Sequence, residues 1–240
     1  MQITLYTFGK ELGSSIFEKK HTILYGDFNV INYLYDNKII FDKEIILYPD
    51  SSAVYFCAKF ILGKRLREHV STDIQNKLLE ASNEFSKNLF FFGDREEILN
   101  KLIFNIQKQY RNIKIVGQCS GYKYNSSDLV NKINESKADV LFVGLGVGKQ
   151  EKWIIENFKN LNVQLILSVG GWFQYLAGNK KRAPKVLRNL HLEWVHKLII
   201  EYDRVWKRYL LGAPKFFYRV ITRKIVLELK ELKSFENTDL

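Results

Sequence analysis

Residues 138–151 read ADVLFVGLGVGKQE and contain the clearest strand–turn–helix signal in this 240-residue chain. Val140 to Val143 are continuously apolar, which is typical of a parallel strand buried on both faces. Alternate glycines follow and lead into a helical pattern from Gln150. In an open α/β sheet, ligands bind at the carboxyl ends of the strands, where glycine turns and helix N-termini can hold phosphate. A turn that only packs the helix on its strand is the alternative.

The same alternation of strand and helix runs through the first 175 residues. Short apolar runs predict strands at residues 22–25, 44–48, 88–92, 113–116, 139–144 and 163–169. Helical patterns lie between them, with Ser71, Asp94 and Ser126 at their starts as caps. We therefore predict an α/β fold, a Rossmann-like mostly parallel sheet flanked by helices. After this Rossmann-like domain (1–178) we expect a basic helical appendage (179–240) without further strands.

Composition excludes several classes of protein. Apolar residues make up 46% of the chain, so it can bury a core and is not disordered. Two cysteines are too few for a disulfide-stapled secreted scaffold. The N-terminus lacks the pattern of a signal peptide, and no apolar run approaches the roughly 18 residues of a spanning helix. We expect a chain that is soluble or bound at a membrane surface.

Positive charge is concentrated near the C-terminus. The chain carries a formal net charge of +11, and residues 180–224 hold thirteen lysines and arginines against three acidic residues. Helical periodicity places apolar and aromatic residues from Val195 to Tyr209 on one face, away from Lys197, Arg204 and Arg208. Such a basic amphipathic helix favours a polyanion: nucleic acid, an anionic membrane or a diphosphate. The alternatives are a solubilising surface and a helix that packs its apolar stripe on the protein's own core.

A second chemical signal is Tyr48-Pro49-Asp50-Ser51, directly after a predicted strand. A carboxylate at the carboxyl end of a strand is well placed to act as a general base. A cap of the following helix by Asp50 or Ser51 is the alternative.

Taken in order, these motifs resemble the WecG/TagA/CpsF family of glycosyltransferases. The resemblance covers about residues 22–212 and is most specific in the second half of that range. The stretches that carry it are residues 139–154, Val169–Phe173, Leu176–Gly178, Arg182–Pro184, Leu192–Trp194, Arg204 and Lys207–Tyr209, with Pro49-Asp50, Arg67–Ile74, Phe90–Gly93, Ile115–Gly117 and Gly121-Tyr122 before them.

The resemblance implies an inverting glycosyltransferase of cell-surface polysaccharide synthesis. It would move a sugar from a UDP-sugar donor to a polyprenyl-diphosphate-linked sugar acceptor, as a peripheral enzyme at the cytoplasmic face of the plasma membrane. The family implies no metal and no other cofactor, and the chain has no Asp-x-Asp pair to hold one. An anionic membrane surface is the further partner we expect. Nucleic acid is not expected, and a homo-oligomer is left open.

The family's functional residues fall on definite positions of this chain. Its proposed base corresponds to Asp50. The positions implied to bind substrate are Gly121, Tyr122, Gly144, Gly146, Gly148, Lys149, Gln150, Glu151, Asp73, Arg182, Arg204 and Arg208.

Four departures from the family pattern keep two other hypotheses open. Gly148 replaces a proline, Ser51 a glycine and Gln174 an aspartate, and Tyr25-Gly26-Asp27 matches the N-terminal Thr-x-Asn motif poorly. An inactive partner subunit would bind a UDP-sugar without turnover. A nucleic-acid-binding module that uses the basic segment would bind with steep salt dependence.

Overall fold

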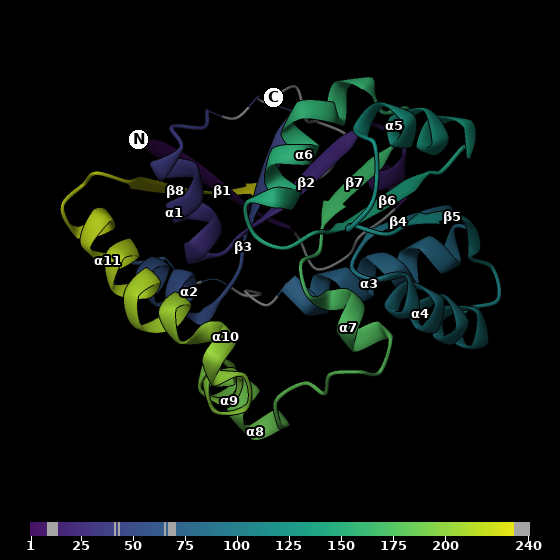
Figure 1. Cartoon of the computed structure of the whole chain (residues 1–240). Coiled ribbons are helices and arrows are strands. Elements are labelled where there is room, and N and C mark those ends of the chain that lie inside the picture. Colours follow the sequence, from purple (N-terminus) through teal and green to yellow (C-terminus); the bar gives the residue numbers. More distant parts are fainter. Residues whose placement is uncertain (9–13, 41, 43, 65, 67–70, 233–240) are drawn as a thin grey trace.

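The fold is built on a central sheet of six parallel strands (Figure 1). The computed structural model describes residues 1–8, 14–40, 42, 44–64, 66 and 71–232. The strand order is β3-β2-β7-β6-β4-β5. Their bounds are β2 (His21–Gly26), β3 (Ile45–Pro49), β4 (Asn88–Gly93), β5 (Lys114–Cys119), β6 (Val140–Gly144) and β7 (Leu165–Ser168). All six correspond to predicted strands, so the Rossmann-like α/β fold is confirmed.

Helices cover both faces of this sheet. On one side lie α1 (Phe28–Asp36), α2 (Ser52–Phe60), α5 (Ser126–Glu135), α6 (Lys149–Asn157) and the 3-10 helix η2 (Phe158–Asn160). On the other lie α3 (Ser71–Glu84), α4 (Glu96–Gln109), α7 (Trp172–Leu176) and the 3-10 helix η1 (Ser14–Phe17). The sheet thus separates two apolar cores.

Alternation along the strands explains the two cores. In β4, Phe90 and Phe92 belong to one core while Leu89 and Phe91 belong to the other. Because both faces are covered, a strand with this pleat carries apolar residues at every position. This is why the interior strands are visible in the sequence as uninterrupted apolar runs.

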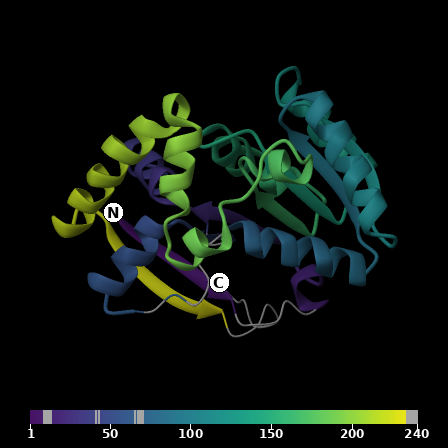
Figure 2. The ribbon, with the colours of Figure 1, turned by 90° about the horizontal axis from the view of Figure 1, so that it is seen from below.

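The C-terminal segment is mainly helical but ends in a strand. It contains α8 (Lys185–Asn189), α9 (Glu193–Ile200), α10 (Tyr202–Lys207), the π-helix η3 (Arg208–Gly212) and α11 (Ala213–Ile221). Then β8 (Val226–Leu232) pairs in parallel with β1 (Gln2–Phe8). The expectation of no strand after residue 178 was wrong, and β1 was also not predicted. Figure 2 shows this pair beside α2 and the C-terminal helices. The domain division at residue 178 stays a prediction.

The expected continuous helix from Val195 to Tyr209 is broken at Glu201. This residue ends α9 and precedes α10, with φ −124° and ψ 36°. Its carboxylate pairs with Lys180 and with Arg204. The break turns α10 relative to α9, so the predicted single apolar face does not exist: Val205 is buried, whereas Ile199 and Tyr202 are exposed.

The expected cap of α4 was wrong, and one stretch of the resemblance cannot be located. Arg95, not Asp94, precedes α4; Asp94 has a positive φ of 46° and its carboxylate accepts a hydrogen bond from Gln174 Nε2. Arg67 and the three residues after it, in the stretch that resembles the family, lie outside the described residues. In the part of the chain that the structure describes, no helix is long and apolar enough to cross a membrane.

Candidate functional site

Two adjoining cavities open where the parallel strands end. The first, the polar cavity, has a volume of about 200 Å³. It lies beyond the carboxyl ends of β2, β3, β6 and β7, which is where ligands bind in open α/β sheets. Its lining includes Tyr25, Asp27, Asp50, Gln75, Gly146 and Gln150. Polar side chains and glycine turns therefore converge on this edge of the sheet.

The second, the apolar cavity, has a volume of about 320 Å³. Aromatic side chains dominate its walls: Phe28, Phe56, Trp194, Tyr209 and Phe217. Helices α1, α2, α9 and α11 and the π-helix supply them. Asp50, Ser71, Thr72, Lys197, Arg208 and Tyr209 line both cavities, so these residues mark the boundary between them.

Asp50 lies on this boundary because β3 ends one residue before it. One carboxylate oxygen accepts a hydrogen bond of 2.8 Å from the backbone N–H of Ser71, at the start of α3. Burial raises the pKa of Asp50, and the nearby charge of Asp27 raises it further. Its carboxylate is thus held by another helix instead of capping α2, which favours the general-base interpretation.

Ser51 occupies a strained backbone position directly after Asp50. Its φ of 77° and ψ of 151° fall in a region that is populated almost only by glycine. A non-glycine residue costs about 1–3 kcal/mol in such a conformation. A glycine, which the resemblance implies at this position, would adopt this backbone without that strain.

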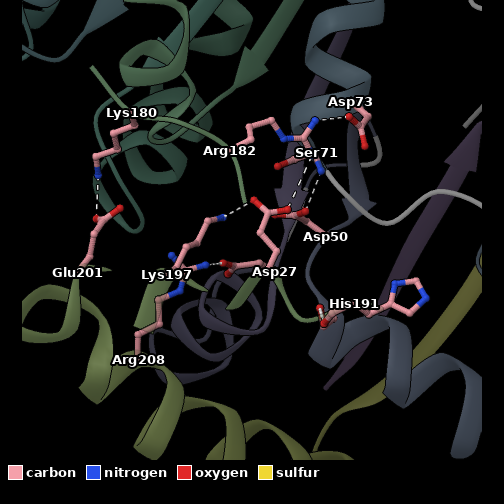
Figure 3. A network of polar contacts seen from close by, with 12 residues as sticks. Asp27, Asp50, Ser71, Asp73, Lys180, Arg182, His191, Lys197, Glu201 and Arg208 are labelled. Carbon is pink, nitrogen blue, oxygen red and sulfur yellow. Dashed lines mark hydrogen bonds and ion pairs between the residues drawn. The ribbon is translucent and has the colours of Figure 1, made fainter. Parts of the chain in front are cut away.

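Asp27 is a second carboxylate of the site that the sequence did not predict. One oxygen caps α1 by accepting hydrogen bonds of 2.8 Å from the N–H groups of Asn29 and Val30. The other is paired with Arg208 (Figure 3). Asp27 directly follows β2 and precedes α1, the same strand–acid–helix pattern that singled out Asp50. That pattern could have identified it.

Lys197 was also missed, because it was assigned to the polar face of a surface helix. Its ammonium group lies 3.2 Å from Glu193 and lines both cavities. Burial lowers the pKa of Lys197, but the charge of Glu193 and the proximity of Tyr175, Tyr209 and Asp50 outweigh it and raise the pKa. Figure 3 shows Lys197 and Arg208 on the same side of Asp50.

The glycine turn after β6 divides into residues that face the polar cavity and residues that support it. Gly146, with φ 87° and open space at its Cβ position, and Gln150 line the cavity. The Gln150 side chain accepts a hydrogen bond of 3.0 Å from the N–H of Gly170. In contrast, Gly144 packs on the Phe173 ring, and Gly148 packs on the Tyr33 ring. Only part of the predicted turn contacts the cavity.

Glu151 and Lys149 lie outside the described lining of both cavities. Glu151 is fully buried and accepts hydrogen bonds from the N–H of Gly148 (2.6 Å) and from Gln150 Nε2 (2.7 Å). Burial raises its pKa to about 7, against these hydrogen bonds. Lys149 is exposed. Glu151 thus fixes the turn and the orientation of Gln150.

Gly121 and Tyr122 are likewise outside the described lining. The N–H of Gly121 donates to the Asp94 carbonyl, and a Cβ there would lie 2.5 Å from the Leu145 side chain. The Tyr122 ring is exposed, with the Arg95 guanidinium 5.9 Å from its centroid. A nucleotide role for this pair stays a prediction.

The remaining predicted residues form ion pairs at the edge of the site, and Figure 3 shows the pair between Arg182 and Asp73. Arg182 pairs with Asp73 and lies 3.8 Å from Glu193, so it joins the appendage to α3. Arg204 pairs with Glu201 and lines the polar cavity. The described residues contain no group of three or more His, Cys, Asp or Glu side chains that could hold a metal ion.

The chain is similar in sequence to a known family and to several named proteins. The family model "Glycosyl transferase WecG/TagA/CpsF family" matches residues 29–229. A Bacillus subtilis (strain 168) protein is 32% identical over 184 residues, 76% of this chain and 70% of the relative. A Bacillus spizizenii protein is 31% identical over 185 residues, with the same coverage. A Staphylococcus aureus (strain NCTC 8325) protein is 28% identical over 152 residues, 63% of this chain and 59% of the relative.

All three relatives carry one name, N-acetylglucosaminyldiphosphoundecaprenol N-acetyl-beta-D-mannosaminyltransferase. The matched region covers the strands of the central sheet after β2, the C-terminal helices and most of the lining of both cavities; Tyr25, Asp27 and Phe28 lie just before it. This chain therefore belongs to the WecG/TagA/CpsF family and is a glycosyltransferase.

Proposed function

We propose that this enzyme transfers a sugar from a UDP-sugar to a sugar carried on a polyprenyl diphosphate, with Asp50 as the general base. The observation that carries the proposal is the position of Asp50 between a polar cavity at the strand ends and an aromatic cavity under the C-terminal helices. The reaction joins a water-soluble nucleotide sugar to a lipid-linked acceptor, so its base must lie where a polar site meets an apolar one.

We place the diphosphate of the donor at the polar cavity. Gly146 leaves its backbone open to a phosphate, and α6 begins three residues later. Lys180, Arg204 and Arg208 also line this cavity. The leaving UDP develops negative charge, and cations fixed beside it stabilise that charge in the transition state.

The proposed reaction is a single displacement. The acceptor hydroxyl oxygen forms a bond to the anomeric carbon while the bond from that carbon to the UDP oxygen breaks. The electron pair leaves with UDP, the proton passes to the Asp50 carboxylate, and the anomeric configuration is inverted. The raised pKa of Asp50 suits this role, because a base works best when its pKa is near the working pH.

The acceptor is proposed from the relatives. Their name specifies an N-acetylglucosaminyl diphosphoundecaprenol acceptor and an N-acetylmannosaminyl group transferred. UDP-N-acetylmannosamine and an N-acetylglucosaminyl diphosphate lipid are therefore the first substrates to test. We assign Gly121 and Tyr122 to the nucleotide side, and Asp73 and Arg182 to the support of the appendage.

Peripheral association with the cytoplasmic face of the membrane belongs to the same proposal. None of the eight residues of α9 is buried, although five of them are apolar or aromatic. Ile199, Ile200, Leu210 and Leu211 are all more than half exposed. An exposed apolar surface of this kind marks a contact with a membrane or another protein.

The basic segment supports this function better than nucleic-acid binding. Lys180, Arg182, Lys197, Arg208 and Arg219 are turned to carboxylates of this chain. Nucleic-acid binding needs cations directed outward to phosphates.

A transfer assay tests the proposal. The full chain is incubated with a panel of UDP-N-acetylhexosamines and an N-acetylglucosaminyl diphosphate lipid, with and without a chelator. We expect a product one sugar larger, formed at the same rate in both conditions. Binding of UDP-sugars without turnover across the whole panel would contradict the proposal and favour an inactive partner subunit.

A further inference from the structure

Asp27 and Asp50 are two acids at the ends of neighbouring strands (Figure 3). Strands β2 and β3 are parallel, and their last register pair is Gly26 with Pro49. Asp27 and Asp50 are the next residues along the two segments, and the N–H of Asp50 donates to the carbonyl of Gly26. Because neighbouring strands lie about 4.8 Å apart, the two acids leave the sheet side by side. Both line the polar cavity.

We propose that Asp27 is a positioning residue for the transfer: it remains ionised beside Asp50, and its negative charge favours passage of the acceptor proton to the Asp50 carboxylate. The inference rests on the proposed function, because it concerns the base of the same reaction. The resemblance implies an asparagine at the position that is nearest to Asp27, so the charge is a departure of this chain. Asp27 itself takes no proton in this step.

The contacts of Asp27 hold its side chain as a carboxylate ion. One oxygen accepts hydrogen bonds from the N–H groups of Asn29 and Val30, and the other pairs with Arg208. Each of these three groups is a donor, and the ionised carboxylate is the form that only accepts. Asp27 is 4% exposed, so solvent ions screen its charge little. A buried negative charge therefore adjoins Asp50.

The surroundings of Asp50 favour its protonated form instead. Burial is the largest cause of the raised pKa of Asp50, and the charge of Asp27 is the next. The N–H of Ser71 and the charge of Lys197 lower the pKa of Asp50, each by less than Asp27 raises it. Two neighbouring acids in such different surroundings divide into one that stays charged and one that can take a proton.

Other titratable and charged groups face Asp50 from both strands and from the C-terminal helices. They are Tyr25 on β2, Tyr48 on β3, Lys197 on α9, and Arg208 and Tyr209 on the π-helix. Burial raises the pKa of Tyr25 and of Tyr209, so these rings stay neutral near neutral pH. Lys197 and Arg208 oppose the effect of Asp27, but Glu193 and Asp27 itself neutralise part of their charge.

Proton transfer relieves the repulsion between the two acids. The acceptor O–H bond breaks, its proton binds to Asp50, and the electron pair of the oxygen forms the bond to the anomeric carbon as UDP leaves. Before this step two negative charges adjoin at the sheet edge, and after it one remains. An interaction that is unfavourable in the ground state and relieved in the transition state accelerates the step.

Capping and docking alone do not require this charge. Asparagine and aspartate are about equally good N-caps, so an asparagine would cap α1 as well. The pairs of Lys215 and Arg219 with Asp36 also dock the C-terminal helices on α1. A buried charge is costly, which makes asparagine the less costly cap. Asp27→Asn therefore keeps the cap, removes the charge and gives up the pair with Arg208.

The pH profile of transfer by the full chain tests the inference. Asp27→Asn should move the acid limb of kcat, where the base becomes protonated, about one pH unit lower, as expected for loss of a neighbouring charge. On the high-pH plateau kcat should fall by up to about tenfold, since one pKa unit is a factor of ten in proton affinity. Asp36→Asn, which also gives up pairs with the C-terminal helices, is the matched control and should keep the midpoint. An unchanged midpoint in Asp27→Asn, or an equal shift in both variants, would overturn the inference.

Carbon-13 NMR of side-chain carboxyl groups follows Asp50 without turnover. The chain is labelled at aspartate, so Glu151 does not contribute, and the Asp50 signal is identified by its loss in Asp50→Asn. We expect the midpoint of this signal to fall in Asp27→Asn. It should stay below the wild-type value when Arg208→Met is added, because this double variant lacks both charges of the pair. Return of the double variant to the wild-type midpoint would assign the shift to the freed Arg208 and overturn the inference.

The two readouts separate this inference from the proposed function. A lowered Asp50 midpoint in Asp27→Asn, without sugar transfer by the wild-type chain, would support the coupling and contradict the proposed function. Transfer that depends on Asp50, with a pH profile and an Asp50 signal that ignore Asp27, would support the proposed function and overturn the inference.

Discussion

Glu151 shows how much one buried carboxyl can affect this fold. Its pKa is raised to about 7 by burial, whereas an unfolded chain releases the proton near the ordinary value of 4.5. Between these values the folded state binds more protons, so its free energy of unfolding falls as pH rises from about 4.5 to about 7. His21, whose pKa is lowered to about 4, contributes the opposite slope. The contribution of Glu151 alone is therefore measured as the difference in the free energy of unfolding between the wild-type chain and a Glu151 variant.

Glu151→Gln should remove this slope. The free energy of unfolding of the variant, taken relative to that of the wild-type chain, should rise by about 3 kcal/mol between pH 4 and pH 8, since each pKa unit is worth about 1.4 kcal/mol. Denaturant unfolding at several pH values measures it. A difference between the two chains that stays constant with pH would show that Glu151 titrates normally.

The residues of the site were only partly predictable for a physical reason. Asp50 and Gln150 follow strands at the sheet edge, so a local pattern places them correctly. Lys197 and Arg208 reach the same place from helices about 150 residues after Asp50, on the two sides of the break at Glu201. Glu201 is an ordinary helical residue in sequence. In the structure its carboxylate pairs with Arg204 three residues later and with Lys180, which is distant in sequence.

At the scale of elements, the start of α6 depends on the glycine at position 148, where the resemblance implies a proline. Gly148 has φ 87°, and its N–H donates to Glu151. A proline is fixed near φ −65° and has no N–H. A proline at position 148 is therefore incompatible with the turn as it is built here.

Gly148→Pro should destabilise the fold. We expect a loss of about 3 kcal/mol or more, from the backbone conformation and the lost hydrogen bond to a carboxylate. Gly171→Ala is the matched control, because nothing lies within 4 Å of its Cβ position, and it should change stability by less than about 0.5 kcal/mol. Equal stability of the proline variant and the wild-type chain would contradict the turn geometry.

The six-stranded sheet was predictable from the sequence, whereas the two-stranded sheet of β1 and β8 was not. Five of the six central strands are buried on both faces, which leaves largely apolar runs in the sequence, whereas the edge strand β5 has no buried residue. In β1 only alternate residues such as Ile3 and Leu5 are buried, and its partner β8 lies at the other end of the chain. A short half-exposed strand has a weak local signal, and no local pattern indicates a partner 224 residues away.

At the scale of the molecule, the lysines and arginines of residues 180–224 fall into two groups. Lys215 and Arg219 pair with Asp36 on α1, and Arg208 pairs with Asp27. Together with the packing of Phe216 on Phe28, these pairs hold α11 and the π-helix against α1. Lys180, Arg188, Lys197 and Arg204 line one or both cavities. Some of the clustered cations thus attach the C-terminal helices to α1, and others are placed to bind the proposed ligands.

Membrane binding should depend on the exposed face of α9. We expect the full chain to bind vesicles that contain anionic lipid, and binding to weaken as salt rises. Replacing Ile199 and Ile200 by aspartate should weaken binding at least tenfold, since each buried isoleucine contributes about 1.5 kcal/mol or more. Phe104→Asp, on α4, is the control. Vesicle sedimentation measures both, and equal binding of all three chains would contradict the proposed orientation.

Asp50→Asn tests the central claim most directly. The amide keeps the shape and can accept the hydrogen bond from Ser71, but it cannot take a proton from the acceptor. We expect kcat for sugar transfer to fall about 10²–10⁴-fold while the dissociation constant of UDP changes less than about threefold. Asp128→Asn, at the exposed start of α5, should retain full activity. Transfer by the Asp50→Asn enzyme within about fivefold of the wild-type rate would remove Asp50 from the chemistry.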